Sequence, residues 1–231
     1  MMNLIHAGTY SISVTLKNNC PYTIWPGTLS GGGTPQLSST GFELASQASN
    51  TIEVPSTWSG RFWGRTQCST DTNGKFKCSS GDCASGQISC NGAGGIPPVS
   101  LVEITLSGAD GKDFYDVSLV DGFNVPVSIK PLAGSCHITS CPNDVNKICP
   151  QDLALKGSDG SVIACKSACL ALNQPQYCCS GSFNTPDKCP PTNYSKIFKD
   201  QCPQAYSYAF DDKSSIFTCP SGGNYEITFC P

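Results

Sequence analysis

Residues 165–189 read CKSACLALNQPQYCCSGSFNTPDKC and place five cysteines, two of them adjacent, in one short segment. The longer segment from Cys136 to Cys202 contains nine of the sixteen cysteines of the chain. A dense, even set of cysteines persists as disulfides only in an oxidising compartment, because a reducing cytosol keeps thiols free. Cys178 and Cys179 are too close in sequence to bridge each other easily, so each is expected to pair elsewhere. The sequence therefore predicts a secreted protein held together by disulfides.

Metal binding is a poor alternative for these cysteines. The sequence has no Cys-x2-Cys pair and only two histidines, His6 and His137. Zinc sites made from cysteine and histidine use closely spaced pairs, so we expect no metal and no cofactor. The formal net charge of −3 argues against nucleic acid or an anionic membrane as the electrostatic partner.

The first seven residues, MMNLIHA, leave two interpretations open. They resemble the remnant of a signal peptide, because Ala7 suits a small-residue cleavage site, but they lack a basic region and a full apolar run. The alternative is an artificial or misassigned start. We place the folded unit at 8–231. No later stretch approaches the roughly 20 apolar residues of a membrane span, so we expect no transmembrane segment.

The composition favours a rigid fold with many turns. Charged residues make up 13% of the chain, well below the roughly 25% of an average domain. The chain also has 23 glycines and 17 prolines. Disordered chains are also rich in glycine and proline, but they lack the 39% of hydrophobic residues found here.

Outside the cysteine-rich segment, apolar and polar residues alternate. A period of two is typical of half-buried strands in antiparallel sheets. The first and last of these strands are candidates to pair, with Cys20 and Cys230 bridging the termini. The alternating apolar positions are Tyr10-Ile12-Val14-Leu16, Val102-Ile104-Leu106, Val125-Val127-Ile129 and Tyr225-Ile227-Phe229.

The cysteine-rich segment has few alternating runs and two short helical patterns. We expect one helix around Ala164–Leu172, which would put Cys165 and Cys169 on one face, and a second from about Ser195 to Cys202. Such a segment buries too little apolar area unaided and is stapled instead. A smaller excursion carries Cys68, Cys78, Cys83 and Cys90.

Acidic residues concentrate in a short region: Glu103, Asp110, Asp113, Asp116 and Asp121. Glu103 lies on a predicted strand whose other face is apolar, so its carboxylate should face solvent or a cleft. One interpretation is a solvated sheet face. The other is a groove lined by carboxylates, which either cut glycosidic bonds as an acid and a base or nucleophile or bind sugars by accepting hydrogen bonds from hydroxyl groups.

The only two arginines, Arg61 and Arg65, both lie in residues 60–65, GRFWGR. A guanidinium group held near several carboxylates keeps them ionised and fixes their orientation. Phe62 and Trp63 either stack on a sugar or pack in the core of a strand, and the core is the favoured interpretation.

Several motifs together resemble the thaumatin-like proteins of plants. The likeness covers residues 9–231, and all sixteen cysteines fall in the family order. The motifs are 18–25 (NNCPYTIW), 64–68 (GRTQC), 81–83 (GDC), 113–125 (DFYDVSLVDGFNV), 176–179 (QYCC), 191–195 (PTNYS), 206–212 (YSYAFDD) and 224–231 (NYEITFCP).

The resemblance implies a mainly β fold, in which an antiparallel β-sandwich core carries two disulfide-rich excursions with short helices. By motif, the core covers 8–65, 104–141 and 203–231, a small disulfide loop region covers 66–103, and a cysteine-rich helical region covers 142–202. The implied disulfides are Cys20–Cys230, Cys68–Cys78, Cys83–Cys90, Cys136–Cys219, Cys141–Cys202, Cys149–Cys165, Cys169–Cys178 and Cys179–Cys189.

The acidic cleft of the family falls by motif on five residues here: Arg61, Glu103, Asp116, Asp121 and Asp212. Asp211 stands beside the last and leaves that assignment open. We expect the five to converge on a groove between the sandwich and the segment from Cys136 to Cys202. Asp116 and Asp121 are five residues apart and would face opposite sides of an unbroken strand, so a bend or turn must separate them. Crowding of these acids should raise the pKa of Glu103 or Asp116.

The resemblance also implies a function, in plant defence. It implies a monomeric antifungal protein, secreted to the apoplast or vacuolar, that binds β-1,3-glucan of fungal walls, and it implies an allergen. A weak endo-β-1,3-glucanase with Glu103 as acid and Asp116 as nucleophile or base is the first alternative. A protein-binding module that inhibits hydrolases or permeabilises membranes is the second. Asn193 begins an N-glycosylation sequon.

Overall fold

Strand β1 (Ser11–Asn18) presents one apolar and one polar face, as its alternating sequence predicts. Ile12, Val14 and Leu16 are buried on the inner face. Tyr10, which the sequence placed with them, precedes the strand and is 71% exposed. The alternation thus locates the strand correctly but extends it one position too far.

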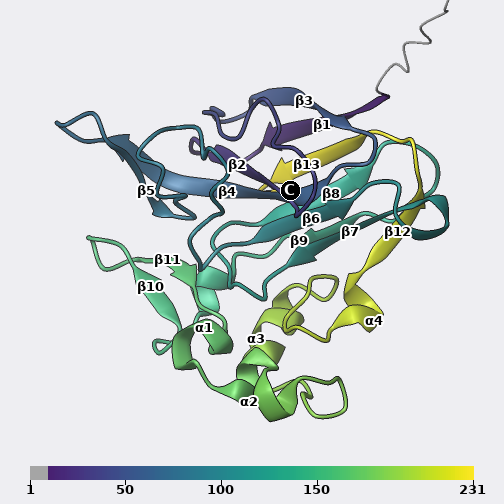
Figure 1. Ribbon diagram of the computed structural model, residues 1–231. Helices are drawn as coiled ribbons and strands as arrows, with labels where there is room; N and C mark the ends of the chain where they lie inside the picture. Colours follow the sequence, from purple (N-terminus) through teal and green to yellow (C-terminus); the bar gives the residue numbers. More distant parts are fainter. Residues whose placement is uncertain (1–9) are drawn as a thin grey trace, which may run out of the picture.

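Two β-sheets form the body of the protein in the computed structural model, which describes residues 10–231 (Figure 1). The expected signal-peptide remnant at 1–7 lies outside the described residues. The strand order is β3-β1-β13-β8-β9 in the first sheet and β12-β7-β6-β4-β2 in the second, with β5 paired to β4. Besides β1, the first sheet contains β3 (Ser49–Pro55), β8 (Val127–Pro131), β9 (Thr139–Cys141) and β13 (Tyr225–Phe229). The second contains β2 (Trp25–Ser30), β4 (Ser59–Thr70), β5 (Phe76–Ser80), β6 (Leu101–Thr105), β7 (Lys112–Ser118) and β12 (Phe217–Pro220).

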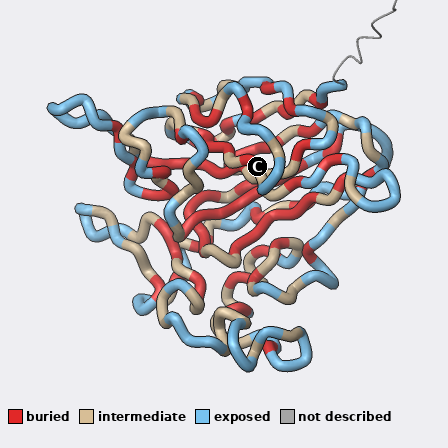
Figure 2. The backbone as a smooth tube through the Cα atoms, in the orientation of Figure 1, coloured by how far each residue is buried: buried red, intermediate tan, exposed pale blue. Residues whose placement is uncertain are grey.

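The two sheets share one hydrophobic core, which confirms the predicted mainly β sandwich. Residues facing inward from β1 belong to the same buried cluster as Phe62 of β4, Ile104 of β6 and Tyr115 of β7. Figure 2 shows buried residues running along the strands of both sheets. Burial of alternate residues on two facing sheets is the usual source of stability in a sandwich.

The first and last strands do pair, but β1 runs parallel to β13, whereas antiparallel pairing was expected. The other pairs between the named strands are antiparallel. Because parallel strands end at the same edge of a sheet, Cys20 and Cys230, which follow β1 and β13, come together with their Cα atoms 5.1 Å apart. Alternation reports which residues face the core and carries no information on strand direction.

The segment between β9 and β12 contains most of the helices and one small hairpin (Figure 1). Its hairpin consists of β10 (Ala154–Lys156) and β11 (Val162–Cys165). The helices of the described chain are η1 (Ala109–Gly111), η2 (Val145–Ile148), α1 (Ala168–Leu172), α2 (Pro175–Cys178), η3 (Gly181–Phe183), α3 (Asn193–Gln201) and α4 (Asp212–Ser215). None of the helices in residues 10–231 is long and apolar enough to cross a membrane.

The first predicted helix begins later than expected. Residues 162–165 form β11, and α1 begins at Ala168 after Ser167, whose hydroxyl accepts a hydrogen bond from the Leu170 amide. The β-branched Val162 and Ile163 favour the strand. Cys165 and Cys169 therefore do not share a helix face, which corrects the prediction.

Eight disulfides join all sixteen cysteines, and the pairs are those that the resemblance implies. Three of them lie wholly within residues 142–202. Residues in that segment are mostly half-buried or exposed, as the colours of Figure 2 show. Because it buries so little apolar surface, this segment depends on its disulfides for a fixed shape.

Helix α3 begins with a capping box that supports a direct test. The Thr192 hydroxyl accepts from the Ser195 amide, and the Ser195 hydroxyl accepts from the Thr192 amide. We expect Thr192→Ala to lower the free energy of unfolding by about 1 kcal/mol, because the first turn loses a partner for its amide. Urea unfolding measures the change, with Thr72→Ala in an exposed turn as the matched control. Equal effects of the two changes would contradict the role of the cap.

Candidate functional site

Three charged side chains stand in a row across neighbouring strands of the second sheet. Arg61 of β4 is the register partner of Glu103 of β6, and Glu103 is the register partner of Asp116 of β7. Residues directly opposite each other project from the same face of a sheet, with Cβ atoms about 4.5–5.5 Å apart. Their neighbours Phe62, Ile104 and Tyr115 face the core instead. The row therefore lies on the outer face of the sandwich.

A pocket of about 280 Å³ opens over this row. Its lining residues are Gly31, Ser59, Gly60, Arg61, Glu103, Ile104, Thr105, Phe114, Asp116 and Ile216. None of them belongs to residues 136–202. That segment therefore does not line this pocket, although we expected it to form one side of the groove. The covering residue, Ile216, comes from the C-terminal part of the chain.

The burial of Asp116 follows from the path of residues 207–216. Before this stretch, the Tyr206 amide donates to the Val117 carbonyl. After it, Phe217 of β12 pairs with Tyr115. The chain therefore leaves the edge of β7 and returns to it on either side of Asp116, and α4 lies in the excursion. Asp116 is left only 7% exposed.

The electrostatic environment favours a protonated Asp116. Burial, with the charges of Glu103 and Asp212 as smaller causes, raises the pKa of Asp116 to about 8. Its Oδ2 atom is buried and has no hydrogen-bond partner among the described residues. A carboxylic acid that is neutral at pH 7 can both donate and accept a hydrogen bond. The predicted rise in pKa is present, although burial contributes more than crowding.

Opposing effects act on the pKa of the Glu103 carboxyl group. Burial raises its pKa, the Arg61 guanidinium lowers it, and the charge of Asp121 raises it. The Arg61 Nε and Glu103 Oε1 atoms are 4.0 Å apart, and both side chains are about 40% exposed. Asp121 lies in a turn after β7, closed by a hydrogen bond from the Gly122 amide to the Leu119 carbonyl. This is a bend of the kind that the spacing of Asp116 and Asp121 required.

The two adjacent aspartates near the C-terminus have different surroundings. Asp212, the first residue of α4, accepts a hydrogen bond of 2.9 Å from the Tyr206 hydroxyl and acts electrostatically on Asp116. Asp211 forms an ion pair of 2.8 Å with Lys199 and accepts from both the amide and the hydroxyl of Ser207. The geometry thus associates Asp212 with the row and leaves Asp211 in a structural role.

Other charged residues near the row in sequence do not join it. Asp113 is buried and accepts hydrogen bonds from the Tyr225 hydroxyl (2.7 Å) and the Ser107 amide (2.8 Å). Asp110 is exposed in η1. The acidic segment that looked continuous in sequence is divided by the fold.

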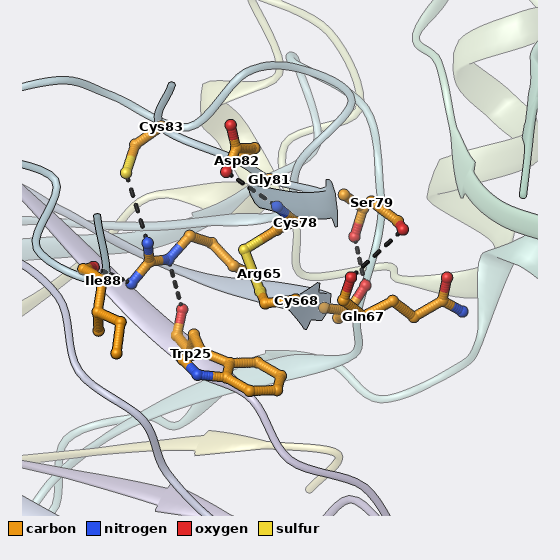
Figure 3. Close-up of a disulfide and its surroundings, with 12 residues drawn as sticks. Trp25, Arg65, Gln67, Cys68, Cys78, Ser79, Gly81, Asp82, Cys83 and Ile88 are labelled. Atoms are coloured by element: carbon orange, nitrogen blue, oxygen red, sulfur yellow. Dashed lines mark hydrogen bonds between the residues drawn. A yellow bond between two sulfur atoms is a disulfide. The ribbon is translucent and has the colours of Figure 1, made fainter. Parts of the chain in front are cut away.

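The second arginine, Arg65, is a core residue. Its guanidinium group donates to the carbonyl oxygens of Trp25 (2.9 Å), Pro26 (3.2 Å) and Ile88 (2.6 Å), as Figure 3 shows in part. Burial lowers the pKa of Arg65 to about 10. Phe62 and Trp63 are buried as well, in accordance with the core interpretation.

Sequence reasoning assigned no role to Phe114 and Ile216, which line the pocket, or to Tyr206, whose hydroxyl donates to Asp212. Tyr206 was noticed only as part of a motif, because nothing in its sequence context indicates that its hydroxyl binds Asp212. Within residues 10–231, no group of three or more His, Cys, Asp or Glu side chains is arranged to hold a metal ion.

Arg61 supports a second test. We expect Arg61→Gln to raise the pKa of Glu103, because the positive charge that lowers it is removed. The free energy of unfolding should change by less than about 1 kcal/mol, since both side chains are well solvated. Carboxyl-carbon NMR titration measures the pKa, with Lys130→Gln as the control. An unchanged Glu103 pKa in Arg61→Gln would contradict the electrostatic role of Arg61.

Comparison with known proteins identifies the family. The thaumatin family matches residues 18–231. The chain is 68% identical to thaumatin-like protein 1 of Pyrus pyrifolia, across 98% of this chain and 93% of the relative. It is 58% identical to a glucan endo-1,3-beta-glucosidase of Prunus avium, across 99% and 94%. It is 55% identical to pathogenesis-related protein 5 of Arabidopsis thaliana, across 94% and 89%.

A solved structure supports the fold. The thaumatin-like xylanase inhibitor aligns with a TM-score of 0.51 and 23% identity, covering 94% of this chain and 99% of the inhibitor. At this identity the likeness concerns the fold alone. The resemblance that the motifs indicated is therefore confirmed by the profile match and by the close relatives. This chain belongs to the thaumatin family.

Proposed function

We propose that this protein is a secreted defence protein with antifungal activity, and that it binds β-1,3-glucan at the row formed by Arg61, Glu103 and Asp116. The observation that supports this most is the raised pKa of Asp116, about 8, beside an arginine-paired glutamate. A site with a neutral acid, a carboxylate and a guanidinium group suits sugar hydroxyls, which both donate and accept hydrogen bonds. Membership of a family with pathogenesis-related relatives agrees with a defence role.

The pocket provides complementary chemistry for a sugar chain. Below pH 8 the Asp116 carboxyl can donate to a sugar oxygen, while Glu103 accepts from a hydroxyl and Arg61 donates to another. Phe114 and Ile216 add apolar surface for the carbon-bound hydrogens of the ring. Asp212 and Asp121 do not line the pocket, but their charges act on Asp116 and Glu103 respectively.

Incubation with insoluble linear β-1,3-glucan tests the proposal. We expect the protein to be pulled down with the polymer and to leave no new reducing ends. Glu103→Ala should reduce the bound fraction, whereas Glu43→Ala, an exposed residue outside the pocket, should not. Absence of pull-down would overturn glucan binding and favour the protein-binding alternative.

Weak hydrolysis of β-1,3-glucan is the second candidate, favoured by the opposed carboxyl groups of Glu103 and Asp116 and by the glucanase relative. The raised pKa of Asp116 supports the opposite roles from those first suggested, because Asp116 has the protonated state that a general acid needs near neutral pH. Glu103, partnered by Arg61, suits the nucleophile or base. Appearance of reducing ends with the wild type, and their loss in Asp116→Asn, would support this candidate.

Location and modification belong to the same proposal. Eight disulfides agree with an oxidising compartment, extracellular or vacuolar, and we expect the protein to act there as a monomer. Asn193 is exposed at the start of α3, where an attached glycan would meet no buried surface. Mass spectrometry of the protein purified from its native tissue would detect that glycan.

A further inference from the structure

A second pocket, of about 460 Å³, lies apart from the acidic row and shares no lining residue with its pocket. Its lining residues come from β2 and the loop before it, β4, η2 and its N-terminal cap, the residues before β8, and the β10–β11 hairpin. Its volume falls in the range of about 300–1,000 Å³ typical of small-molecule sites. Its lining residues are Tyr22, Thr23, Trp25, Thr66, Gln67, Asn124, Asp144, Asn146, Ser161, Val162 and Ile163.

Two aromatic rings line this pocket. Trp25 is half-buried and packs against Phe76 with ring centroids 6.2 Å apart, so its ring is held in place. Tyr22 is 46% exposed. Burial and the charge of Asp144 raise the pKa of Tyr22, which agrees with their lining the same pocket. A fixed, half-buried ring such as that of Trp25 is suited to stacking on the apolar face of a ligand ring.

One buried polar atom among the lining residues lacks a partner, the Oδ1 atom of Asn146. The Asn146 amide nitrogen donates to the carbonyl oxygens of Asn124 (3.1 Å) and Ile163 (3.3 Å), which fixes the side chain. Its Oδ1 atom is buried and has no hydrogen-bond partner among the described residues. Buried polar atoms are seldom left unpaired, so an acceptor fixed in this way calls for a donor.

Gln67 adds a second independent signal. Its backbone is in the left-handed region with φ of 51°, a conformation that costs a residue other than glycine about 1 kcal/mol or more. In Figure 3 its side chain extends away from Arg65, while its carbonyl oxygen accepts from the Ser79 hydroxyl at 3.3 Å. The side-chain amide forms no hydrogen bond with any described residue. Strained backbone that presents a free polar group to a pocket is a recurrent feature of ligand sites.

We propose that this pocket is a second binding site, for a neutral saccharide unit stacked on Trp25. Its lining contains no lysine or arginine, and Asp144 is its only charged residue, so an anionic ligand is disfavoured. The remaining polar groups are hydroxyls and amides, which match the hydroxyls of a sugar. The proposal does not rest on glucan binding at the acidic row.

Tryptophan fluorescence tests the site, because Trp58 and Trp63 are buried and Trp25 is the tryptophan that lines the pocket. We titrate laminaritriose, a neutral trisaccharide, and expect a saturable change in emission. Asp116→Asn should retain the change and Trp25→Phe should lose it. No saturable change with laminaritriose, or an unchanged signal in Trp25→Phe, would overturn the proposal. A finding that the acidic row does not bind glucan would leave this proposal intact.

Gln67→Gly separates binding from folding. Glycine relieves the left-handed backbone, so the free energy of unfolding should stay equal or rise, while laminaritriose affinity should fall about five- to tenfold through loss of the amide. If Gln67 has only a structural role, the variant should change the free energy of unfolding and leave the laminaritriose affinity unchanged. That result would overturn the assignment of Gln67 to the binding site. Saturable binding of choline in place of the sugar would overturn the ligand class, since Asp144 and the rings would then hold a cation.

Discussion

Asp116→Asn is expected to stabilise the protein at pH 7, by about 1–4 kcal/mol. Asp116 has a pKa of about 8 in the folded protein, against an ordinary value of 3.8. A folded-state pKa above the unfolded value means that the stabilising contribution is complete below about pH 4. It is lost progressively as the pH rises from 4 towards 8, because the unfolded chain then releases this proton while the folded protein keeps it bound. Asparagine has nearly the same shape and carries no charge at any pH.

The difference in the free energy of unfolding between Asp116→Asn and the wild type should therefore depend on pH. Urea unfolding should give similar stabilities at pH 4 and an increasing advantage of Asp116→Asn at pH 6 and pH 8. Asp187→Asn, at an exposed loop position, is the matched control and should show no such trend. A variant less stable than the wild type at pH 8 would contradict the burial of an uncompensated carboxyl group. An advantage with no pH dependence would show that the pKa is ordinary.

The disulfide between Cys20 and Cys230 should contribute more stability than any other. Its sequence separation is 210, and in the chain-entropy account a loop of that length is worth about 5 kcal/mol. We expect Cys20→Ala/Cys230→Ala to lower the melting temperature by about 10–20 °C. The parallel pairing of β1 with β13 remains possible without the bond, so the fold should persist.

A second double variant is the control for this prediction. Cys68→Ala/Cys78→Ala opens a loop with a sequence separation of 10, for which the same account gives about 3 kcal/mol. Scanning calorimetry on both variants, with the other seven disulfides intact, compares them directly. If removing Cys20–Cys230 lowers the melting temperature no more than removing Cys68–Cys78 does, the result would contradict stabilisation by loop closure. It would indicate that local packing dominates.

The sequence was most informative where a pattern repeats. Period-two alternation located β1, β6 and β13, and it correctly put Glu103 on the face opposite its apolar neighbours. The resemblance supplied what alternation could not, because spacing alone does not fix which cysteines pair. The five expected cleft residues came from the same source.

Three features depended on pairing partners and escaped prediction, and in two of them the partner is distant in sequence. Asp116 is buried because residues 207–216 return to β7, about ninety positions later in the chain. Asp113 is a core residue because its partner is the Tyr225 hydroxyl, 112 positions away. The start of α1 was misplaced because Val162–Cys165 pair with β10, a tertiary preference that helical spacing does not reveal.

The most direct test of the glucan site is carboxyl-carbon NMR of the wild-type protein during titration with laminarihexaose at pH 6. If the sugar binds on the row, the side-chain carboxyl resonances of Glu103 and Asp116 should shift together and saturate with one affinity. The resonance of Asp187 should stay in place. Sugar binding that leaves both row carboxyls unmoved would contradict the account.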